Sequence, residues 1–300
     1  MNFAFPQTEG AEPRANIDRL RADVTALTST KIPRSYENLA GLKEAAKYIE
    51  NEWKKSGLKV AYQKFKAGKN TYENVVTTMG PSKGPRIVIG AHYDVAGPLP
   101  GADDNASGIA GLLEIARLIQ QRKPTLKYRI DLVAYTLEEP PFFGSDQMGS
   151  AVHAKSLKEL KAEVLFMLSL EMVGYFSDKK NSQSFPIPEL AKIYPSTGNF
   201  IGVVGDPTSK ALVTQVTRLM KQASKVDVQA LNAPRELPGV SLSDHSSYWE
   251  YGYPAIMLTD TAFMRNPHYH TKGDTADTLD YKSMAEVVEG VYNVLINFSK

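Results

Sequence analysis

One stretch of the chain constrains its fold more than any other. Residues 86–108 read RIVIGAHYDVAGPLPGADDNASG. The stretch begins with an uncharged apolar run, which predicts a buried strand, and the run ends in a polar tip that carries His92 and Asp94. A loop rich in Gly and Pro follows, and Asp103-Asp104 then stands at the start of a helical pattern. A strand, a loop and a helix in this order predict an α/β fold, in which ligands bind at the carboxyl ends of the strands.

Strand and helix patterns alternate along the rest of the chain. Apolar and alternating runs predict strands at 58–66, 72–79, 86–91, 128–137, 164–170, 200–204, 226–231 and 255–259. Helical spacing predicts helices at 14–30, 35–56, 106–121, 146–155, 207–223 and 282–298, and a short helix near residue 245. The alternation predicts a single α/β domain over residues 1–300, with a mixed, mostly parallel central sheet flanked by helices. Within it we expect an N-terminal helical extension at 1–34 and a surface excursion at 176–199, a polar segment with three prolines.

The composition is that of an ordinary globular protein. Hydrophobic residues make up 42% of the chain, and the formal net charge of +2 is too small to indicate nucleic acid or an anionic membrane surface. No apolar run reaches the length of a transmembrane helix, and residues 1–10 lack the pattern of a signal peptide. We therefore expect no nucleic acid and no membrane among the partners, and we favour the cytoplasm over export with a leader removed. The sequence assigns no oligomeric state.

Any metal site in this chain has to be built from histidine and carboxylate side chains, because the sequence contains no cysteine. Acidic residues follow three apolar strand patterns in succession, at Asp94, at Glu138-Glu139 and at Glu171. Like charges brought together cost energy unless a cation lies among them. The recurrence therefore indicates a cation at the carboxyl end of the sheet, although an exposed acidic turn at Glu138-Glu139 is an alternative.

Histidines and a further acidic pair lie near these strand ends. Asp94 follows His92 by two residues, so the two side chains face the same side of an extended chain, and the carboxylate can orient the imidazole. Asp103-Asp104 can bridge two cations or can cap the helix that follows. In the polar segment 266–280, His268 and His270 are both candidates, and only one of them need be a ligand.

The other two histidines have structural interpretations. We expect His153 on the surface of its helix, and we expect Asp244-His245 to brace the site without binding a metal directly.

Together these motifs resemble the two-zinc aminopeptidase family, which is related to glutamate carboxypeptidases and glutaminyl cyclases. The resemblance extends from about residue 35 to the C-terminus and follows the family order. It rests on His92-Tyr93-Asp94, the sequence GADDNASG at 101–108, Glu138-Glu139, Glu171 and Tyr269-His270-Thr271. The resemblance implies the three-layer fold of zinc exopeptidases and a metal-dependent exopeptidase, in the first place an aminopeptidase acting on peptides with a free N-terminus.

The resemblance also implies a role for each matching residue. It implies two Zn²⁺ per chain, for which Co²⁺ or Mn²⁺ could substitute. His92 and Glu171 would hold one ion, Glu139 and His270 the other, and Asp104 would bridge them. Glu138 matches the general base, Asp94 the residue that orients His92, and Tyr269 a hydroxyl donor to the oxyanion in some relatives.

The sequence departs from the family pattern at two places. Glu171 stands where aspartate is common, and the segment Pro140–Gly144 replaces a Gly-containing sequence. We expect Phe142-Phe143 and the excursion 176–199 to form an apolar pocket, which predicts a preference for an apolar first residue in the substrate.

Three alternatives remain at this stage. A glutamate carboxypeptidase would need cations for the carboxylates of its substrate, and Arg235 and Arg265 are the candidates. A glutaminyl cyclase would be an acyltransferase with a similar site. An inactive receptor-like domain is disfavoured, because such decay should remove ligands or the base, and all are present.

Overall fold

An eight-stranded sheet forms the centre of the computed structural model, which describes residues 12–299. The first eleven residues of the expected N-terminal extension lie outside this part. The strands are β1 (Val60–Ala67), β2 (Asn70–Met79), β3 (Arg86–His92), β4 (Arg129–Tyr135), β5 (Val164–Glu171), β6 (Phe200–Gly205), β7 (Asp227–Asn232) and β8 (Ala255–Thr259). Their order is β1-β2-β4-β3-β5-β8-β6-β7. The central strands β4, β3, β5 and β8 run parallel, whereas β1 and β2 pair in antiparallel fashion at one edge and β6 pairs antiparallel with β8. The expected mixed, mostly parallel sheet is confirmed.

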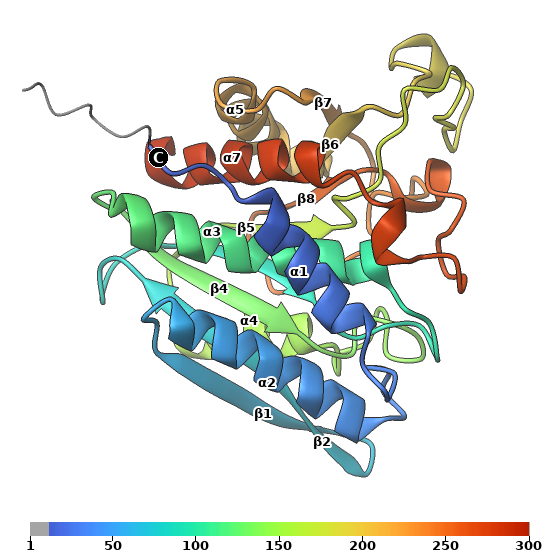
Figure 1. The fold of residues 1–300 in the computed structure, drawn as a ribbon. Coiled ribbons are helices and arrows are strands. Elements are labelled where there is room, and N and C mark those ends of the chain that lie inside the picture. The colour runs from blue at the N-terminus through green and yellow to red at the C-terminus, as the bar shows by residue number, and fades with distance from the viewer. Residues whose placement is uncertain (1–11, 300) are drawn as a thin grey trace, which may run out of the picture.

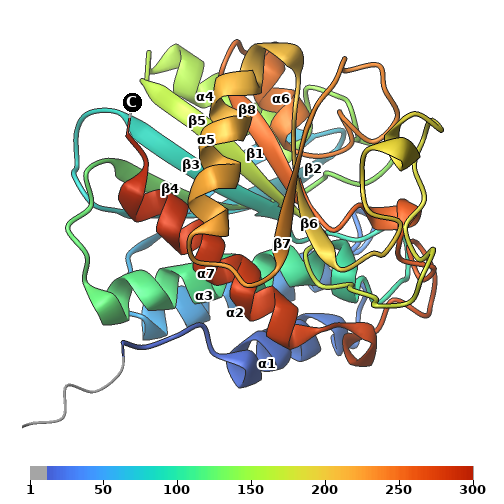
Figure 2. The ribbon, with the colours of Figure 1, turned by 90° about the horizontal axis from the view of Figure 1, so that it is seen from above.

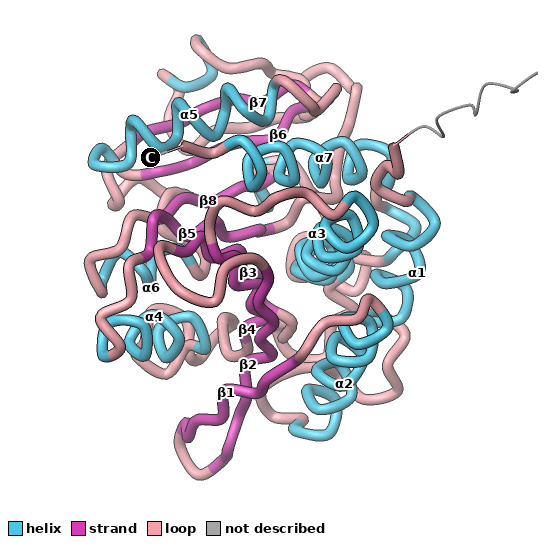
Figure 3. Tube along the Cα trace, turned by 90° about the vertical axis from the view of Figure 1, so that its left-hand side faces the viewer, coloured by secondary structure: helices cyan, strands magenta, loops and turns pink. Residues whose placement is uncertain are grey.

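Helices cover both faces of the sheet and complete three layers. They are α1 (Ile17–Thr28), α2 (Leu39–Lys55), α3 (Gly108–Arg122), α4 (Gly149–Glu159), α5 (Lys210–Lys221), α6 (His245–Glu250) and α7 (Tyr281–Asn297). Figure 1 shows α1, α2, α3 and α7 on one face, and α5 lies beside α7 on that face (Figure 2). The opposite face carries α4 and α6 (Figure 3). None of the helices in residues 12–299 has both the length and the apolar character needed to cross a membrane.

The central strand β3 shows why this arrangement forms. Ile87 and Ile89 belong to the larger core cluster, whereas Val88 between them belongs to the smaller one on the other face. Alternate side chains of a strand point to opposite faces, so a strand that is apolar at every position has to be covered on both sides.

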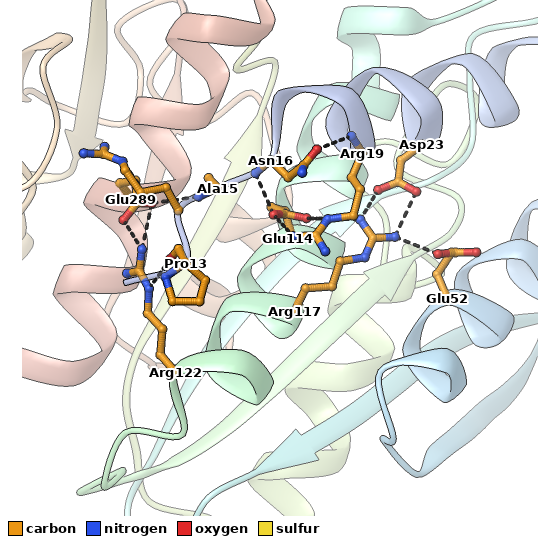
Figure 4. A network of polar contacts seen from close by, with 11 residues as sticks. Pro13, Ala15, Asn16, Arg19, Asp23, Glu52, Glu114, Arg117, Arg122 and Glu289 are labelled. Atoms are coloured by element: carbon orange, nitrogen blue, oxygen red, sulfur yellow. Dashed lines mark hydrogen bonds and ion pairs between the residues drawn. The ribbon is translucent and has the colours of Figure 1, made fainter. Parts of the chain in front are cut away.

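Helix α1 is joined to the other helices on its face of the sheet by buried charges (Figure 4) and by apolar contacts. On α3, Arg117 forms ion pairs with Asp23 of α1 and Glu52 of α2. Leu20 of α1 is completely buried and belongs to the larger core cluster. The helix α1 therefore packs as part of the core.

Two segments depart from the regular alternation of strands and helices. Residues 102–107 form an irregular turn before α3, which begins only at Gly108. The segment 176–199 contains one short 3₁₀ helix, Leu190–Lys192, and projects beyond the layers at the upper right of Figure 1.

The expectation for His153 is wrong. The side chain is buried, because α4 packs against α6 and the sheet, and its Nδ1 lies 2.6 Å from the hydroxyl of Tyr248 on α6. The apolar periodicity predicted that His153 lies in a helix, but it carried no information about α6, the second helix that covers this side chain.

Candidate metal centre and active site

The carboxyl ends of three neighbouring strands bring the candidate residues together. β3 ends at His92, and β5, its parallel neighbour, ends at Glu171. β4 pairs with the other side of β3, and Glu138-Glu139 begins three residues after the end of β4. Since parallel strands end at the same edge of a sheet, these side chains meet there.

The turn 102–107 brings Asp104 to the same edge. Gly101 precedes the turn with φ +61°, and a Cβ at this position would lie 2.3 Å from the carbonyl oxygen of Asp104, so only glycine fits. Asn105 fixes the turn to the end of β5, because its Nδ2 donates to the carbonyl oxygen of Leu170 at 2.9 Å and its Oδ1 accepts from the N–H of Met172 at 3.0 Å.

The first candidate metal group surrounds His92, which is completely buried. Its Nε2 lies 3.3 Å from Oδ1 of Asp104 and 3.4 Å from Oε2 of Glu171. Oε2 of Glu138 lies 3.7 Å from the same nitrogen. One imidazole nitrogen therefore faces three carboxylates.

The second candidate metal group surrounds His270. Its Nε2 lies 3.0 Å from Oδ2 of Asp104 and 3.4 Å from Oε2 of Glu139. The two carboxylate oxygens of Asp104 thus face different histidines. His268, the other candidate of this segment, packs its ring against Tyr175 and does not join either group.

The orphaned polar atoms of the site fit a bound cation. Nδ1 of His92 lies 3.2 Å from the backbone oxygen of Asp94, which favours the tautomer with hydrogen on Nδ1. The lone pair of Nε2 then faces the carboxylates and has no hydrogen-bond partner, and buried Oε1 of Glu139 also lacks one. Histidine nitrogen and carboxylate oxygen are the donors that zinc accepts in catalytic sites without cysteine.

The pKa shifts of the buried carboxylates also indicate a bound cation. Burial raises the pKa of Glu138 well above its usual value, and burial together with nearby Asp104 raises the pKa of Glu139 to about 7. Burial acts in the same direction on Asp104, but in the metal-free protein the protonated imidazoles of His270 and His92 outweigh it and lower the pKa of that carboxyl. Buried carboxylates in this number are costly to ionise unless positive charge lies among them.

Asp94 makes a contact that the sequence did not suggest. Its Oδ1 accepts a hydrogen bond from the backbone N–H of Glu138 at 3.2 Å, and its Oδ2 accepts from the N–H of Glu139 at 3.1 Å. Oδ1 also lies 3.7 Å from Nδ1 of His92. The carboxylate therefore contacts the backbone of the acidic pair as well as the imidazole.

Three polar residues near the site were not among the sequence candidates. Ser243 donates to Oε2 of Glu171 at 2.8 Å. The carboxylate of Asp274 accepts from the backbone N–H groups of Asp103 and Asp104. Asp260 is fully buried directly after β8. An acidic residue at a strand end was the signal used elsewhere, and it could have found Asp260.

The remaining candidates lie outside the two groups. His245 places Nε2 2.7 Å from the carbonyl oxygen of Val240. Arg235 pairs with Asp206 at 2.8 Å, and Arg265 donates to the carbonyl oxygen of Phe200 at 2.7 Å. Each guanidinium group thus has a partner within the protein.

An apolar pocket lies beside the metal groups and includes Glu171 and Tyr269 in its wall. Its floor is lined by residues of β6, β7 and β8, and the excursion contributes to one wall, as expected. The pocket is lined mainly by Gln183, Phe185, Pro186, Leu190, Tyr194, Phe200, Gly202, Val204, Leu242, Met257, Thr259, Phe263 and Met264.

The expectation that Phe142-Phe143 would line this pocket is wrong. The ring of Phe142 packs edge-on against Tyr36, with 5.6 Å between centroids, and against Tyr72, with 6.1 Å. The chain turns at Pro140-Pro141 and carries these aromatic residues toward β2 and the start of α2, away from the pocket lining.

Comparison with known proteins identifies the family. Residues 74–295 match the family model described as Peptidase family M28. The chain belongs to this family. It is therefore a metallopeptidase, and the M28 peptidases depend on zinc.

Relatives of this M28 peptidase agree with the assignment. It is 46% identical to the Escherichia coli protein YfbL, described as uncharacterized, over 98% of this chain and 91% of that one. It is 26% identical to a probable leucine aminopeptidase of Arthroderma otae over 90% of this chain and 69% of that one.

Solved structures show the same fold. LapA of Legionella pneumophila superposes with a TM-score of 0.75 and 26% identity over 94% of this chain and 72% of that one. The glutaminyl cyclase of Bacteroides thetaiotaomicron superposes with a TM-score of 0.70 and 19% identity over 96% and 99% of the two chains, and this likeness concerns the fold alone.

Proposed function

We propose that this M28 peptidase is an aminopeptidase, which releases the first residue from peptides with a free N-terminus. The observation that carries the proposal is the position of Asp104, whose Oδ1 faces His92 and whose Oδ2 faces His270. The likeness to the Arthroderma otae protein and to LapA supports it.

The two groups of side chains provide places for two zinc ions. His92 and Glu171 would hold one ion, Glu139 and His270 the other, and Asp104 would contribute one oxygen to each. Bound zinc would supply Lewis acidity, which polarises the scissile carbonyl and makes water a better nucleophile at neutral pH. Co²⁺ or Mn²⁺ would find the same donor atoms acceptable.

Glu138 is the general base of this proposal. Its carboxylate is buried beside His92, and burial raises its pKa, so Oε2 can take a proton from the attacking water and return it to the leaving amine. Proton transfer of this kind contributes about 10²–10⁴-fold to rate. Asp94 holds the backbone of Glu138 and thereby keeps the base in place.

Two further residues would contact the substrate. Glu171 forms the border between the metal groups and the apolar pocket, so together with Glu138 it can bind the free α-amine as an ammonium ion. Tyr269 also lines the pocket, and its ring stacks on that of His270 with 3.9 Å between centroids. We assign its hydroxyl as a donor to the oxyanion.

The apolar pocket would take the side chain of the first residue. Beside Glu171, the pocket is lined mainly by apolar groups from β6, β8 and the excursion. A pocket of this kind gains free energy from each methylene that it removes from water, so we expect faster release of leucine, methionine and phenylalanine than of alanine or charged residues.

Metal content and substrate form test this function directly. We expect about two zinc ions per chain by metal analysis, release of leucine from a free-amine peptide, and loss of release after chelation that zinc restores. The N-acetylated form of the same peptide should remain intact. Cleavage of only the blocked, C-terminally acidic peptide would instead indicate a carboxypeptidase. One bound zinc, with cyclisation of N-terminal glutamine and release of ammonia, would indicate a glutaminyl cyclase.

A further inference from the structure

The loop that carries Asp104 is held between two buried side chains of opposite charge. One is Arg34, which lies between α1 and α2, and the other is Asp274, which follows His270 by four residues. Both side chains are almost completely buried. Neither belongs to the two candidate metal groups.

Asp274 binds three successive backbone N–H groups of the loop. Its Oδ1 accepts from the N–H of Asp103 at 2.9 Å and its Oδ2 accepts from the N–H of Asp104 at 3.1 Å. Its own backbone oxygen accepts from the N–H of Ala102 at 3.1 Å. The orientation of the turn is therefore fixed by one residue of another segment.

Arg34 binds the carbonyl groups that precede them. Its Nη1 donates to the carbonyl oxygen of Pro100 at 2.7 Å, and its Nη2 donates to that of Gly101. Nη1 also donates to the carbonyl oxygen of Leu27 in α1 at 2.7 Å. Arg34 thus donates hydrogen bonds to the carbonyl groups of residues 100–101, and Asp274 accepts hydrogen bonds from the N–H groups of residues 102–104.

The contact of Asp274 repeats the contact of Asp94. In both cases one carboxylate accepts from the N–H groups of two consecutive acidic residues, Asp103-Asp104 in one case and Glu138-Glu139 in the other. Each acidic pair contains a proposed metal ligand, and each is held through its backbone, which leaves the side chains of the proposed ligands Asp104 and Glu139 free to face the histidines.

We propose that Asp274 is a positioning residue of the metal centre. It holds the backbone of Asp104 so that the two carboxylate oxygens face His92 and His270, and it links this loop to the segment that carries His270 itself. Mutation of a group that holds the ligands of a metal in place typically costs about 10–100-fold in metal affinity or activity. The inference rests on the proposed function, because it takes Asp104 and His270 as ligands.

The chemistry of the contact requires a carboxylate. Asparagine at position 274 would offer one accepting oxygen and a donating NH₂ group, which would face the N–H of Asp103 or Asp104. Glutamate would keep two accepting oxygens and the charge but would move them by one methylene. The two substitutions therefore separate loss of the acceptor from a change of length.

Asp274→Asn, Asp274→Glu and the control Asp277→Asn test the proposal. Asp277 lies in the same segment, is exposed, and accepts from the hydroxyl of Thr275 at 2.6 Å. The first readout is zinc affinity by competition with a chromophoric chelator, and the second is the visible absorption spectrum of the Co²⁺-loaded protein. The apparent melting temperature of the metal-free protein and the separate values of kcat and KM complete the set.

We expect Asp274→Asn to bind zinc about 10–100-fold more weakly, to change the Co²⁺ spectrum at saturation and to lower kcat more than it raises KM. Asp277→Asn should match the parent in every readout. Asp274→Glu should retain more affinity than Asp274→Asn but less than the parent, and its comparison with the parent decides the matter if Asp274→Asn does not fold.

Parent-like zinc affinity and Co²⁺ spectrum in Asp274→Asn would overturn the inference while leaving the proposed function intact. An Asp274→Glu variant that folds with the zinc affinity and the Co²⁺ spectrum of the parent would overturn it as well, because a shift of the accepting oxygens by one methylene would then not reach the metal centre. If the parent itself binds no zinc or releases no residue from free-amine peptides, the proposed function fails, and the inference fails with it.

Discussion

The hydroxyl group of Ser243 donates a hydrogen bond to Oε2 of Glu171 at 2.8 Å. The same oxygen lies 3.4 Å from Nε2 of His92. Glutamate has one more rotatable bond than aspartate, so it needs a second contact to present a defined oxygen to a metal. Ser243 provides this contact, and Ser169, whose Oγ lies 2.8 Å from that of Ser243, holds the serine in turn.

Ser243→Ala should therefore weaken zinc binding. Without the hydroxyl, Glu171 gains rotational freedom and loses a hydrogen bond, and we expect the affinity for zinc to fall about 10–100-fold. Zinc titration against a competing chelator measures the change. Ser241→Ala, at a half-buried serine whose hydroxyl donates to the carbonyl oxygen of Arg235, is the control and should leave the affinity unchanged. Equal affinity in the two variants would contradict the role of Ser243.

Glu138→Gln should separate metal binding from turnover. The amide cannot accept the proton of the attacking water, so we expect kcat to fall about 10²–10⁴-fold while the zinc content stays at the parent value. Glu139→Gln is the informative comparison, because Oε2 of Glu139 lies 3.4 Å from Nε2 of His270 and its loss should reduce metal content. If Glu138→Gln turned over as fast as the parent, the base would be misassigned.

Gly202 sets the depth of the apolar pocket, and its substitution should change the substrate preference. A Cβ at this position would lie 3.3 Å from the carbonyl oxygen of Thr259 and 3.8 Å from Cγ2 of Val204, both residues of the pocket lining. Gly202→Val should therefore fill the floor. We expect the kcat/KM ratio of leucine to alanine substrates to fall about 10-fold, the scale of one or two methylenes in an apolar pocket.

The matched control for Gly202→Val is Ile193→Ala. Ile193 lies in the excursion, is 72% exposed and does not line the pocket. An unchanged leucine-to-alanine ratio in Gly202→Val, with activity retained, would mean that the first side chain binds elsewhere.

The sequence predicted the residues that meet at strand ends, because parallel topology alone brings His92, Glu138-Glu139 and Glu171 to one edge of the sheet. Residues that act through loop contacts had no such signal. Asp274 and Ser243 reach the site because distant loops fold back over it, and local patterns do not encode that path.

The two wrong expectations have the same cause. Whether His153 is buried depends on α6, and where Phe142 points depends on Tyr36 and Tyr72, which are remote in sequence. Periodicity shows that a helix exists but not which elements cover its second face.

The ion pairs of Arg117 should contribute to stability without a role in catalysis. Its guanidinium contacts Asp23, Glu52 and Glu114, which belong to three different helices, and the group is largely buried. Arg117→Met would remove the ion pair of Asp23 and one of the two cations that contact each of Glu52 and Glu114, and we expect a loss of about 3–5 kcal/mol in the free energy of unfolding. Urea denaturation measures it. Arg14→Ala, which removes a half-exposed pair with Glu286, should cost less than about 1 kcal/mol.

Protonation of the buried histidines should destabilise the protein in weak acid. Burial lowers the pKa of both His153 and His245 to about 4, whereas an unfolded histidine has its ordinary value near 6.5. Because the unfolded chain takes up protons first, the stability that depends on the neutral imidazoles is fully present above pH 6.5 and is lost as the pH falls toward 4. At pH 5 the loss amounts to about 2 kcal/mol for each histidine.

The carboxylates of the metal centre also titrate in this range, so the contribution of His153 has to be measured as a difference. We expect His153→Gln, which keeps an acceptor for the hydroxyl of Tyr248, to be less stable than the parent at pH 7 but to lose about 2 kcal/mol less between pH 7 and pH 5. Urea unfolding of the metal-free proteins at the two pH values gives both numbers. If the two proteins lost the same free energy of unfolding over this interval, His153 would not be the group that takes up the proton.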